Sequence, residues 1–138
     1  MIVLDTNVLA ELLCPAPDPA VIMWLGAQTP AQVFTTAITE AEIRYGVARL
    51  EAGRRREGLM AAITAIFAED FAGRVLAFDA ECATAYADIV AARERTGRPI
   101  SQFDAQIAAI ARMHDAAIAT RNVKDFEALG LTILNPFS

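Results

Sequence analysis

The feature that most constrains the fold is the alternation of short apolar runs with longer segments of helical periodicity. The apolar runs cover residues 1–4, 32–36, 74–78, 116–120 and 131–134. Between them, apolar residues recur at the three-to-four-residue spacing of an amphipathic helix. Strands that alternate with helices in this way pair in parallel, because each helix carries the chain back to the start of the next strand. The sequence therefore predicts a three-layer α/β domain.

The predicted helices begin at residues that can cap them. They span residues 6–13, 19–28, 39–53, 54–71, 80–97 and 101–114, with a last short helix at 126–129. Thr39-x-x-Glu42 and Ser101-x-x-Asp104 have the spacing of a capping box, in which a hydroxyl and an acid satisfy free backbone N–H groups. Asp125 precedes the last helix and can cap it in the same way.

Composition bounds the kind of protein. With 138 residues and 55% hydrophobic content, the chain is not disordered and can bury the core of one domain, spanning 1–138 with a helical pair at about 39–70. No apolar run reaches the roughly 20 residues of a membrane span, and no basic segment of a secretion signal precedes the first one. Cys14 and Cys82 form no metal-type cluster and suit a reducing compartment, so we expect a cytoplasmic protein.

The net charge of −5 argues against a non-specific nucleic-acid coat, which is usually basic. It leaves room for an enzyme whose acids lie in a metal site and whose arginines lie on the rim. Lys124 is the one lysine among the 12 basic residues. Arginine suits phosphate recognition, although a bias in genomic codon use explains the same preference.

Polar residues follow the predicted strands at the point where a parallel sheet binds ligands. Asp5 lies just after the first strand, and Glu42 lies in the first turn of the helix that follows the second. Asp104 lies in the first turn of the helix before the fourth strand, and Asn122 and Asp125 follow that strand. Because sites in open parallel sheets form at the carboxyl ends of the strands, these side chains are expected to meet.

Each of these acids has a simple structural explanation, since a carboxylate in a first helical turn is stabilised there by about 0.3–1 kcal/mol. Taken together they indicate a functional site, because three or four carboxylates at one edge of the sheet repel one another unless a cation binds between them. Oxygen ligands without His or Cys suit Mg²⁺ or Mn²⁺. The sequence therefore predicts a divalent-metal site.

Four segments in order resemble the motifs of the PIN-domain ribonucleases, and most closely the VapC-type toxins of bacterial toxin–antitoxin pairs. They are MIVLDTNVLAELL, AITEAEIRYGVARL, SQFDAQIAAIA and ATRNVKDFEALGLTILNPF. The resemblance covers nearly the whole chain as a single PIN domain. It implies a central parallel five-stranded sheet flanked by helices and a Mg²⁺- or Mn²⁺-dependent endoribonuclease. It also implies a cognate VapB-type antitoxin that blocks the site, and a homodimer.

By position, Asp5, Glu42 and Asp104 match the three acids of this family. We expect Asp5 and Asp104 to be the main direct metal ligands, and Glu42 to bind the metal through a water or to orient the attacking water. The family's usual fourth acid is replaced by Asn122, which can coordinate weakly but carries no charge. Asp125, three residues later, can contribute through a water or hold the loop.

Other residues are assigned supporting roles. Thr6, Asn7 and Thr120 are expected to orient the acids by hydrogen bonds, because metal ligands need such partners. Candidate RNA-binding residues are Arg121 and Lys124 beside the site, and the basic run Arg54, Arg55 and Arg56. A second basic run is Arg93, Arg95 and Arg98. For both runs, a solvated helix end is the slightly favoured explanation.

Two other classes of function fit parts of the pattern. A PIN-like module with a degenerate site would bind RNA or protein without cleaving it, as the amide at Asn122 allows. A phosphatase-like hydrolase with an aspartyl nucleophile also begins with an acid after its first strand. It usually has Asp-x-Asp, however, where this chain has Asp5-Thr6-Asn7, and Lys124 is the only candidate for its lysine.

Overall fold

The computed structural model describes all of residues 1–138, and its five strands form one parallel sheet in the order β3-β2-β1-β4-β5. The strands are β1 (Ile2–Leu4), β2 (Val33–Thr36), β3 (Val75–Leu76), β4 (Ala117–Ala119) and β5 (Ile133–Leu134). Val3 of β1 pairs with Phe34 on one side and Ile118 on the other, so β1 is central. The predicted parallel five-stranded sheet is confirmed.

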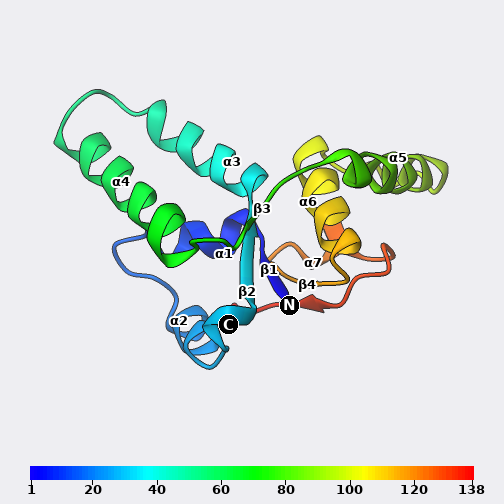
Figure 1. Ribbon diagram of the computed structural model, residues 1–138, viewed down its shortest axis with the longest axis horizontal. Helices are drawn as coiled ribbons and strands as arrows, with labels where there is room; N and C mark the ends of the chain where they lie inside the picture. The colour runs from blue at the N-terminus through cyan, green and yellow to red at the C-terminus, as the bar shows by residue number, and fades with distance from the viewer.

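Seven helices cover the two faces of this sheet. They are α1 (Thr6–Glu11), α2 (Pro19–Gly26), α3 (Ala37–Ala48), α4 (Arg54–Ala65), α5 (Ala80–Arg95), α6 (Gln102–Met113) and α7 (Val123–Phe126). In Figure 1, α3 and α4 run side by side on one side of the sheet, and α5 and α6 lie on the other. The predicted three-layer arrangement is therefore confirmed.

Alternating side chains of the short strands build two separate cores. Val3 and Ile118 are fully buried against α5 and α6, whereas Leu4 and Ala119 are buried against the layer of α1 to α4. Successive residues of a strand point to opposite faces, so β1 and β4 each contribute side chains to both cores. This explains why the strands read as continuous apolar runs rather than alternating ones.

Two of the predicted helix starts are wrong. The α3 helix is capped by Thr36, whose hydroxyl accepts a hydrogen bond from the backbone N–H of Thr39, so Glu42 lies in the second turn. Asp125 does not cap a helix at 126–129 but lies inside α7, after Asn122 at its N-cap. The α3 helix follows β2 without a loop, because Thr36 is both the last residue of β2 and the cap of α3. The α7 helix begins after a short turn, in which Thr120 and Arg121 separate β4 from the cap Asn122.

The other caps follow expectation. Asp5 caps α1 and accepts from the N–H of Thr6, and the Ser101 hydroxyl caps α6 by accepting from the N–H of Asp104. The helix predicted over 54–71 ends as an α-helix at Ala65 and continues as one turn of π-helix, Ile66–Asp70. The helix ends that carry acids are thus fixed locally by their own sequence.

The order of the strands creates a switch point beside β1. The chain runs from β1 outward through β2 and β3, and then crosses to place β4 on the opposite side of β1. The backbone N–H of Asp5 donates to the carbonyl of Ala119 across this junction at 2.9 Å. Connections leaving β1 and β4 diverge here, which opens the crevice that ligands occupy in such sheets.

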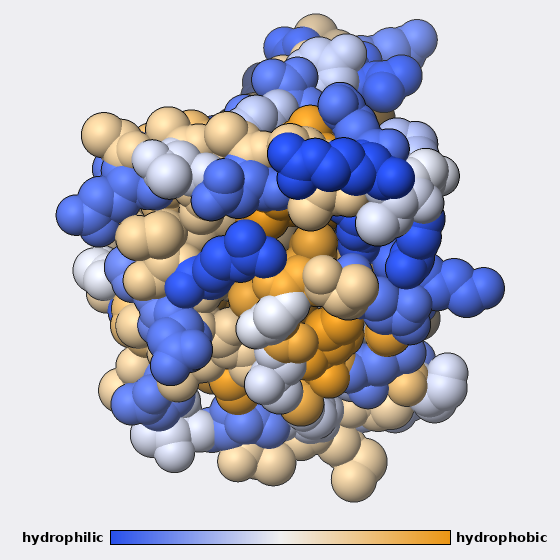
Figure 2. Space-filling model, turned by 90° about the vertical axis from the view of Figure 1, so that its right-hand side faces the viewer, coloured by the Kyte–Doolittle hydropathy of each residue, from blue (hydrophilic) through white to orange (hydrophobic).

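Figure 2 shows a hollowed apolar area on the face that carries α5 in Figure 1, with hydrophilic residues around it. None of the helices is both long and apolar enough to cross a bilayer.

Candidate active site

Asp5 is the most enclosed carboxylate at the carboxyl edge of the sheet, with 2% of its surface exposed. Its Oδ1 accepts from the N–H of Thr6 at 2.8 Å, and its Oδ2 accepts from Thr120 Oγ1 at 2.8 Å and Asn7 Nδ2 at 3.1 Å. Burial raises the pKa of Asp5, the hydrogen bonds from Thr120 and Thr6 oppose it, and the charge of Glu42 adds to the rise. A carboxylate has about four acceptor positions, so one remains free.

The neighbours of Thr120 determine where its hydroxyl proton points. Its oxygen accepts from the backbone N–H of Asn122 at 2.9 Å and from Asn7 Nδ2 at 3.3 Å. A hydroxyl has one proton and two acceptor lone pairs, so the proton of Thr120 is committed to Asp5. The predicted supporting residues Asn7 and Thr120 therefore do contact this carboxylate.

Glu42 reaches the same edge from the second turn of α3. Its Oε1 accepts from Thr6 Oγ1 at 2.8 Å, and Thr6 Oγ1 lies 3.1 Å from Thr39 Oγ1. Because the proton of Thr6 goes to Glu42, Thr39 is the donor between the two threonines. Burial raises the pKa of Glu42, the Thr6 hydrogen bond opposes this, and the charge of Asp104 raises it further.

Asp104 enters from the first turn of α6. Burial and then the charge of Asp5 raise the pKa of Asp104 to about 6, the Ser101 hydroxyl opposes them, and the charge of Asp125 adds to the rise. The loop at 97–100 could have placed the start of α6 at either edge of the sheet. Phe103, the neighbour of Asp104, lines one hollow with Glu42, so the start of α6 lies at the carboxyl edge beside α3.

The site as a whole is an accumulation of negative charge with oxygen donors. The pKa values of Asp5, Glu42 and Asp104 are all raised, partly by one another. A divalent cation would relieve this repulsion. No group of three His, Cys, Asp or Glu side chains lies close enough together to hold a metal ion on protein ligands alone. The oxygen donors and the excess of negative charge fit an ion such as Mg²⁺, which typically takes one or two carboxylates and keeps several waters.

Asn122 and Asp125 lie on the exposed side of the site. The backbone N–H of Asn122 donates to Thr120, but its side chain makes no hydrogen bond within the protein. Asp125 is one turn further along, and its charge raises the pKa of both Asp5 and Asp104. Its carboxylate is exposed and forms no ion pair or hydrogen bond with the rest of the chain.

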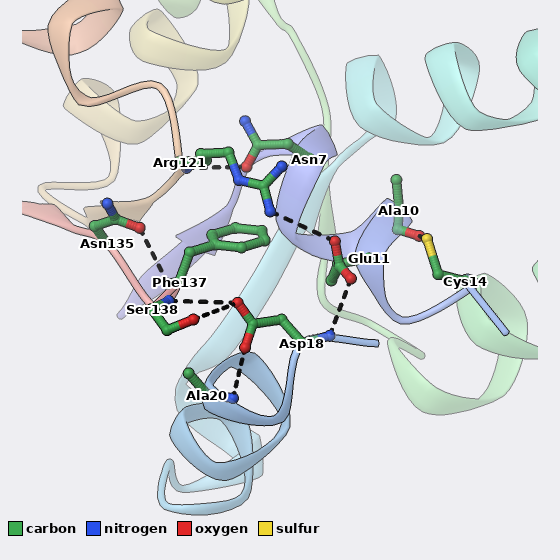
Figure 3. Close-up of polar contacts among 10 residues, drawn as sticks. All are labelled: Asn7, Ala10, Glu11, Cys14, Asp18, Ala20, Arg121, Asn135, Phe137 and Ser138. Carbon is green, nitrogen blue, oxygen red and sulfur yellow. Dashed lines mark hydrogen bonds and ion pairs between the residues drawn. The ribbon is translucent and has the colours of Figure 1, made fainter. Parts of the chain in front are cut away.

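The guanidinium of Arg121 is held beside the site rather than directed into it. Its Nη2 lies 3.7 Å from Glu11 Oε1, and its guanidinium carbon lies 3.8 Å from the centre of the Phe137 ring (Figure 3). The backbone N–H of Arg121 donates to Asn7 Oδ1 at 3.0 Å. At the end of the chain, the hydroxyl of Ser138 donates a hydrogen bond to Asp18. The last residues of the chain thus form one wall beside α1.

The predicted basic residues separate in space. Arg55 lines a groove of about 450 Å³ between α1, α3 and α4 that also contains Thr6 and Glu42. Arg56 donates to the carbonyl of Leu50 instead, and Arg54 lines a different hollow with Arg55 at the turn between α3 and α4. Of this run, only Arg55 shares a cavity with a site acid, and Lys124 is exposed on α7.

Sequence reasoning missed three kinds of residue around the site. Thr39 was assigned to a helix start, although it is fully buried and donates to Thr6. Arg93 was assigned to a solvated helix end, but it is 5% exposed. The spacing of Ile89 and Arg93, four residues apart on one helix face, could have indicated this. Tyr45 and Phe103 are exposed aromatic side chains lining an apolar hollow beside Glu42.

Comparison with known proteins finds a matching family model and close relatives over nearly the whole chain. A family model described as PIN domain matches residues 2–130. The chain is 43% identical to VapC ribonuclease Y4jK of Sinorhizobium fredii (strain NBRC 101917 / NGR234), over 99% of this chain and 98% of that protein. It is 39% identical to Toxin FitB of Neisseria gonorrhoeae (strain ATCC 700825 / FA 1090), over 99% of both chains.

Solved structures give the same result. The chain superposes with a TM-score of 0.93 and 39% identity on a chain of the crystal structure of FitAcB from Neisseria gonorrhoeae, covering 99% of this chain and 98% of that one. A chain in a structure of FitAB bound to a DNA fragment matches with a TM-score of 0.94 and 38% identity, covering 100% of this chain and 96% of that one. On this sequence and structural evidence, the chain belongs to the PIN-domain family, among its VapC-type ribonuclease toxins.

Proposed function

We propose that this protein is a divalent-metal-dependent endoribonuclease that hydrolyses phosphodiester bonds and is held inactive by a cognate antitoxin. The observation that carries the proposal is the bridge that Thr6 makes at the switch point, where its N–H donates to Asp5 and its hydroxyl donates to Glu42. The raised pKa of Asp104, to which the charge of Asp5 contributes, supports a third acid near this pair. Membership of a family of ribonuclease toxins supports the same activity.

The metal would be Mg²⁺ or Mn²⁺, held by oxygen donors. Asp5 and Asp104 would be direct ligands, Glu42 would act through a water, and Asn122 would be a weak ligand. When bound, such an ion lowers the pKa of a coordinated water and neutralises charge on the phosphate. Thr6, Asn7 and Thr120 support this by orienting the carboxylates through the hydrogen bonds described above.

The protein's own part in the reaction centres on Glu42. The carboxylate of Glu42, oriented by Thr6, accepts a proton from the attacking water. The water oxygen then forms a bond to phosphorus, and the bond from phosphorus to one ribose oxygen breaks. The departing oxygen takes a proton from solvent water, which leaves one new end with a phosphate and the other with a hydroxyl.

RNA would approach across a rim of basic and aromatic side chains. Arg121 and Lys124 follow β4 and are exposed, and Arg55 lies in the groove that contains Glu42. Phosphate contacts of this kind position a nucleic acid without reading its sequence. Tyr45 and Phe103 offer exposed rings on which unpaired bases can stack.

The groove between α1, α3 and α4 suits the antitoxin. It joins Glu42 to apolar side chains such as Leu13 and Leu59. A segment of a VapB-type antitoxin lying in this groove would cover one approach to the site. A place of action in the cytoplasm fits an RNA substrate and the two free cysteines. The homodimer implied by the sequence resemblance stays a prediction.

A direct test is incubation of the purified protein with cellular RNA in Mg²⁺, in Mn²⁺ and in EDTA, beside the Asp5→Asn variant. We expect cleavage with either ion, none in EDTA, and a rate lowered by about a hundredfold or more in the variant. Sequencing of the new ends would identify the RNA and the bond that breaks. Cleavage at the wild-type rate by Asp5→Asn, or in EDTA, would exclude the proposed site.

A second candidate is a module that binds RNA without cutting it, and the uncharged side chain of Asn122 favours this alternative. It predicts binding that persists in EDTA without new RNA ends. An aspartyl-nucleophile hydrolase is disfavoured, because Asp5 is buried and both of its oxygens accept hydrogen bonds. A covalent phosphoryl group trapped on Asp5 would reverse that conclusion.

A further inference from the structure

The carboxylate of Asp125 occupies an unusual place beside the site. It projects from the first turn of α7, forms no hydrogen bond or ion pair with the protein, and influences the pKa of both Asp5 and Asp104. Asn122, at the position where the family resemblance implies an acid, contributes no charge. Asp125 is therefore the only other carboxylate that adds its field to both of these acids.

The α7 helix is held in place by hydrogen bonds from Arg93, near the C-terminus of α5. The buried guanidinium of Arg93 donates from Nη2 to the carbonyl of Asp125 at 2.7 Å and to that of Glu127 at 2.8 Å. No carboxylate lies within ion-pair distance of Arg93, and its Nε makes no hydrogen bond. Burying a cation without a counter-ion is costly, so packing alone does not explain it.

Arg98 adds a second contact of the same kind. Its Nη2 donates to the carbonyl of Lys124 at 3.1 Å and lies 3.6 Å from Glu127 Oε2. A four-residue helix cannot supply partners for its own last carbonyls, and positive charge is favourable at that end. The buried ring of Phe126 anchors the same turn in the core. Together these contacts fix the backbone of α7 while leaving the Asp125 carboxylate free.

We propose that Arg93 is a positioning residue for RNA cleavage. By holding the carbonyls of Asp125 and Glu127, it presents the Asp125 carboxylate at the edge of the site, where it takes the place of the acid missing at position 122. The inference rests on the proposed nuclease activity, which it deepens. It gives a functional role to Arg93, a buried cation that has no ion-pair partner.

A purely structural role for Arg93 makes a different prediction, and a double-mutant cycle separates the two. The variants are Arg93→Met, Asp125→Asn and their combination, with Arg95→Met as the control, because Arg95 is an exposed arginine on the same helix with no contact of this kind. Each variant is measured for kcat and KM on the RNA that the wild-type protein cleaves, and for its thermal unfolding midpoint.

If Arg93 acts through Asp125, Arg93→Met lowers kcat about tenfold in the wild-type background and has no further effect in Asp125→Asn. The loss of thermal stability, in contrast, is the same in both backgrounds. Arg95→Met changes neither quantity. Equal losses of kcat in both backgrounds, or no loss in either, would overturn the inference. Should Arg93→Met fail to fold, Arg93→Lys keeps a donor there and is expected to give a smaller loss of kcat that also vanishes in Asp125→Asn.

Mn²⁺ affinity provides a readout that does not depend on cleavage. We expect Arg93→Met and Asp125→Asn to weaken Mn²⁺ binding by similar factors, and the combination to weaken it no more than either alone. This result would support the positioning role even if no RNA were cleaved, which would count only against the proposed nuclease function. Additive losses of affinity would overturn the positioning role and leave the nuclease function intact.

Discussion

The two sides of the site hold their carboxylates by opposite means. On the β1 side, donors from Thr6, Asn7 and Thr120 contact the Asp5 carboxylate itself. On the α7 side, the contacts from Arg93 reach only backbone carbonyls, and the Asp125 carboxylate has no partner. The first arrangement fixes two oxygens closely, whereas the second fixes a backbone and leaves its side chain able to move. A ligand that must be in place before substrate binds suits the first side.

The largest expected effect on cleavage comes from neutralising the carboxylates of Asp5 and Asp125, one at a time. Asp5→Asn should lower cleavage by about a hundredfold or more, because it removes a direct metal ligand. Asp125→Asn should lower it only about tenfold, as expected for a group acting from outside the ligand set. Initial rates on one RNA substrate, with circular dichroism as the check on folding, measure both. Equal losses would remove the distinction between the two sides.

The donors on the β1 side can be tested through Thr120. Thr120→Val removes the hydrogen bond to Asp5 and leaves the N–H of Asn122 without its partner. We expect about tenfold slower cleavage and a loss of about 2 kcal/mol in the free energy of unfolding. Thr35→Val is the matched control, because Thr35 is equally buried but makes only a 3.4 Å contact with the Leu4 carbonyl. If both variants cleave RNA at the same rate, the hydrogen bond to Asp5 is not needed.

The repulsion between the carboxylates predicts how stability depends on pH. The pKa of Asp104 is raised to about 6 from an unfolded value near 3.8, so the folded state binds a proton more readily. The free energy of unfolding of the metal-free protein should therefore rise as pH falls from about 7 to about 4, by about 1 kcal/mol once solvent screening is allowed for. Denaturation in urea across this range measures it.

Asp104→Asn should weaken that pH dependence without abolishing it, because Asp5 and Glu42, whose pKa values are also raised, remain. Saturating Mg²⁺ should reverse the trend, since a cation bound to the folded state favours the charged carboxylates. A free energy of unfolding that falls between pH 7 and pH 5 without metal would contradict the assignment of a raised pKa.

The smallest effect is expected at the wall formed by the end of the chain. Phe137→Leu removes the ring beneath Arg121 but keeps apolar bulk, and it should cost about 0.5–1 kcal/mol of stability. The value of kcat should stay within about twofold of the wild type, because Asn7 still holds the backbone of Arg121. A tenfold fall in kcat would show that this wall takes part in positioning the carboxylates.

The sequence predicted the sheet and three of the acids because both depend on local pattern. Apolar runs and helical spacing define the layers, and the positions of Asp5 and Glu42 follow from where the first two strands end. The sequence left the position of Asp104 open, because the loop at 97–100 could place the start of its helix at either edge of the sheet. The structural role of Thr39 and the burial of Arg93 depend on contacts between residues far apart in the chain, which no local spacing encodes. The incorrect helix start at Thr39 has the same origin, because Thr36 was counted only as the end of a strand.

The hydrogen bond from the backbone of Asn122 to Thr120 has an evolutionary consequence. Any residue other than proline offers that N–H, so the position can keep its place in the fold whatever side chain it carries. Codons for asparagine and aspartate differ by a single base, and a lineage can therefore pass between the charged and the uncharged form in one step without unfolding the protein. Natural variation at this position would then tune the strength of the toxin while leaving its architecture unchanged.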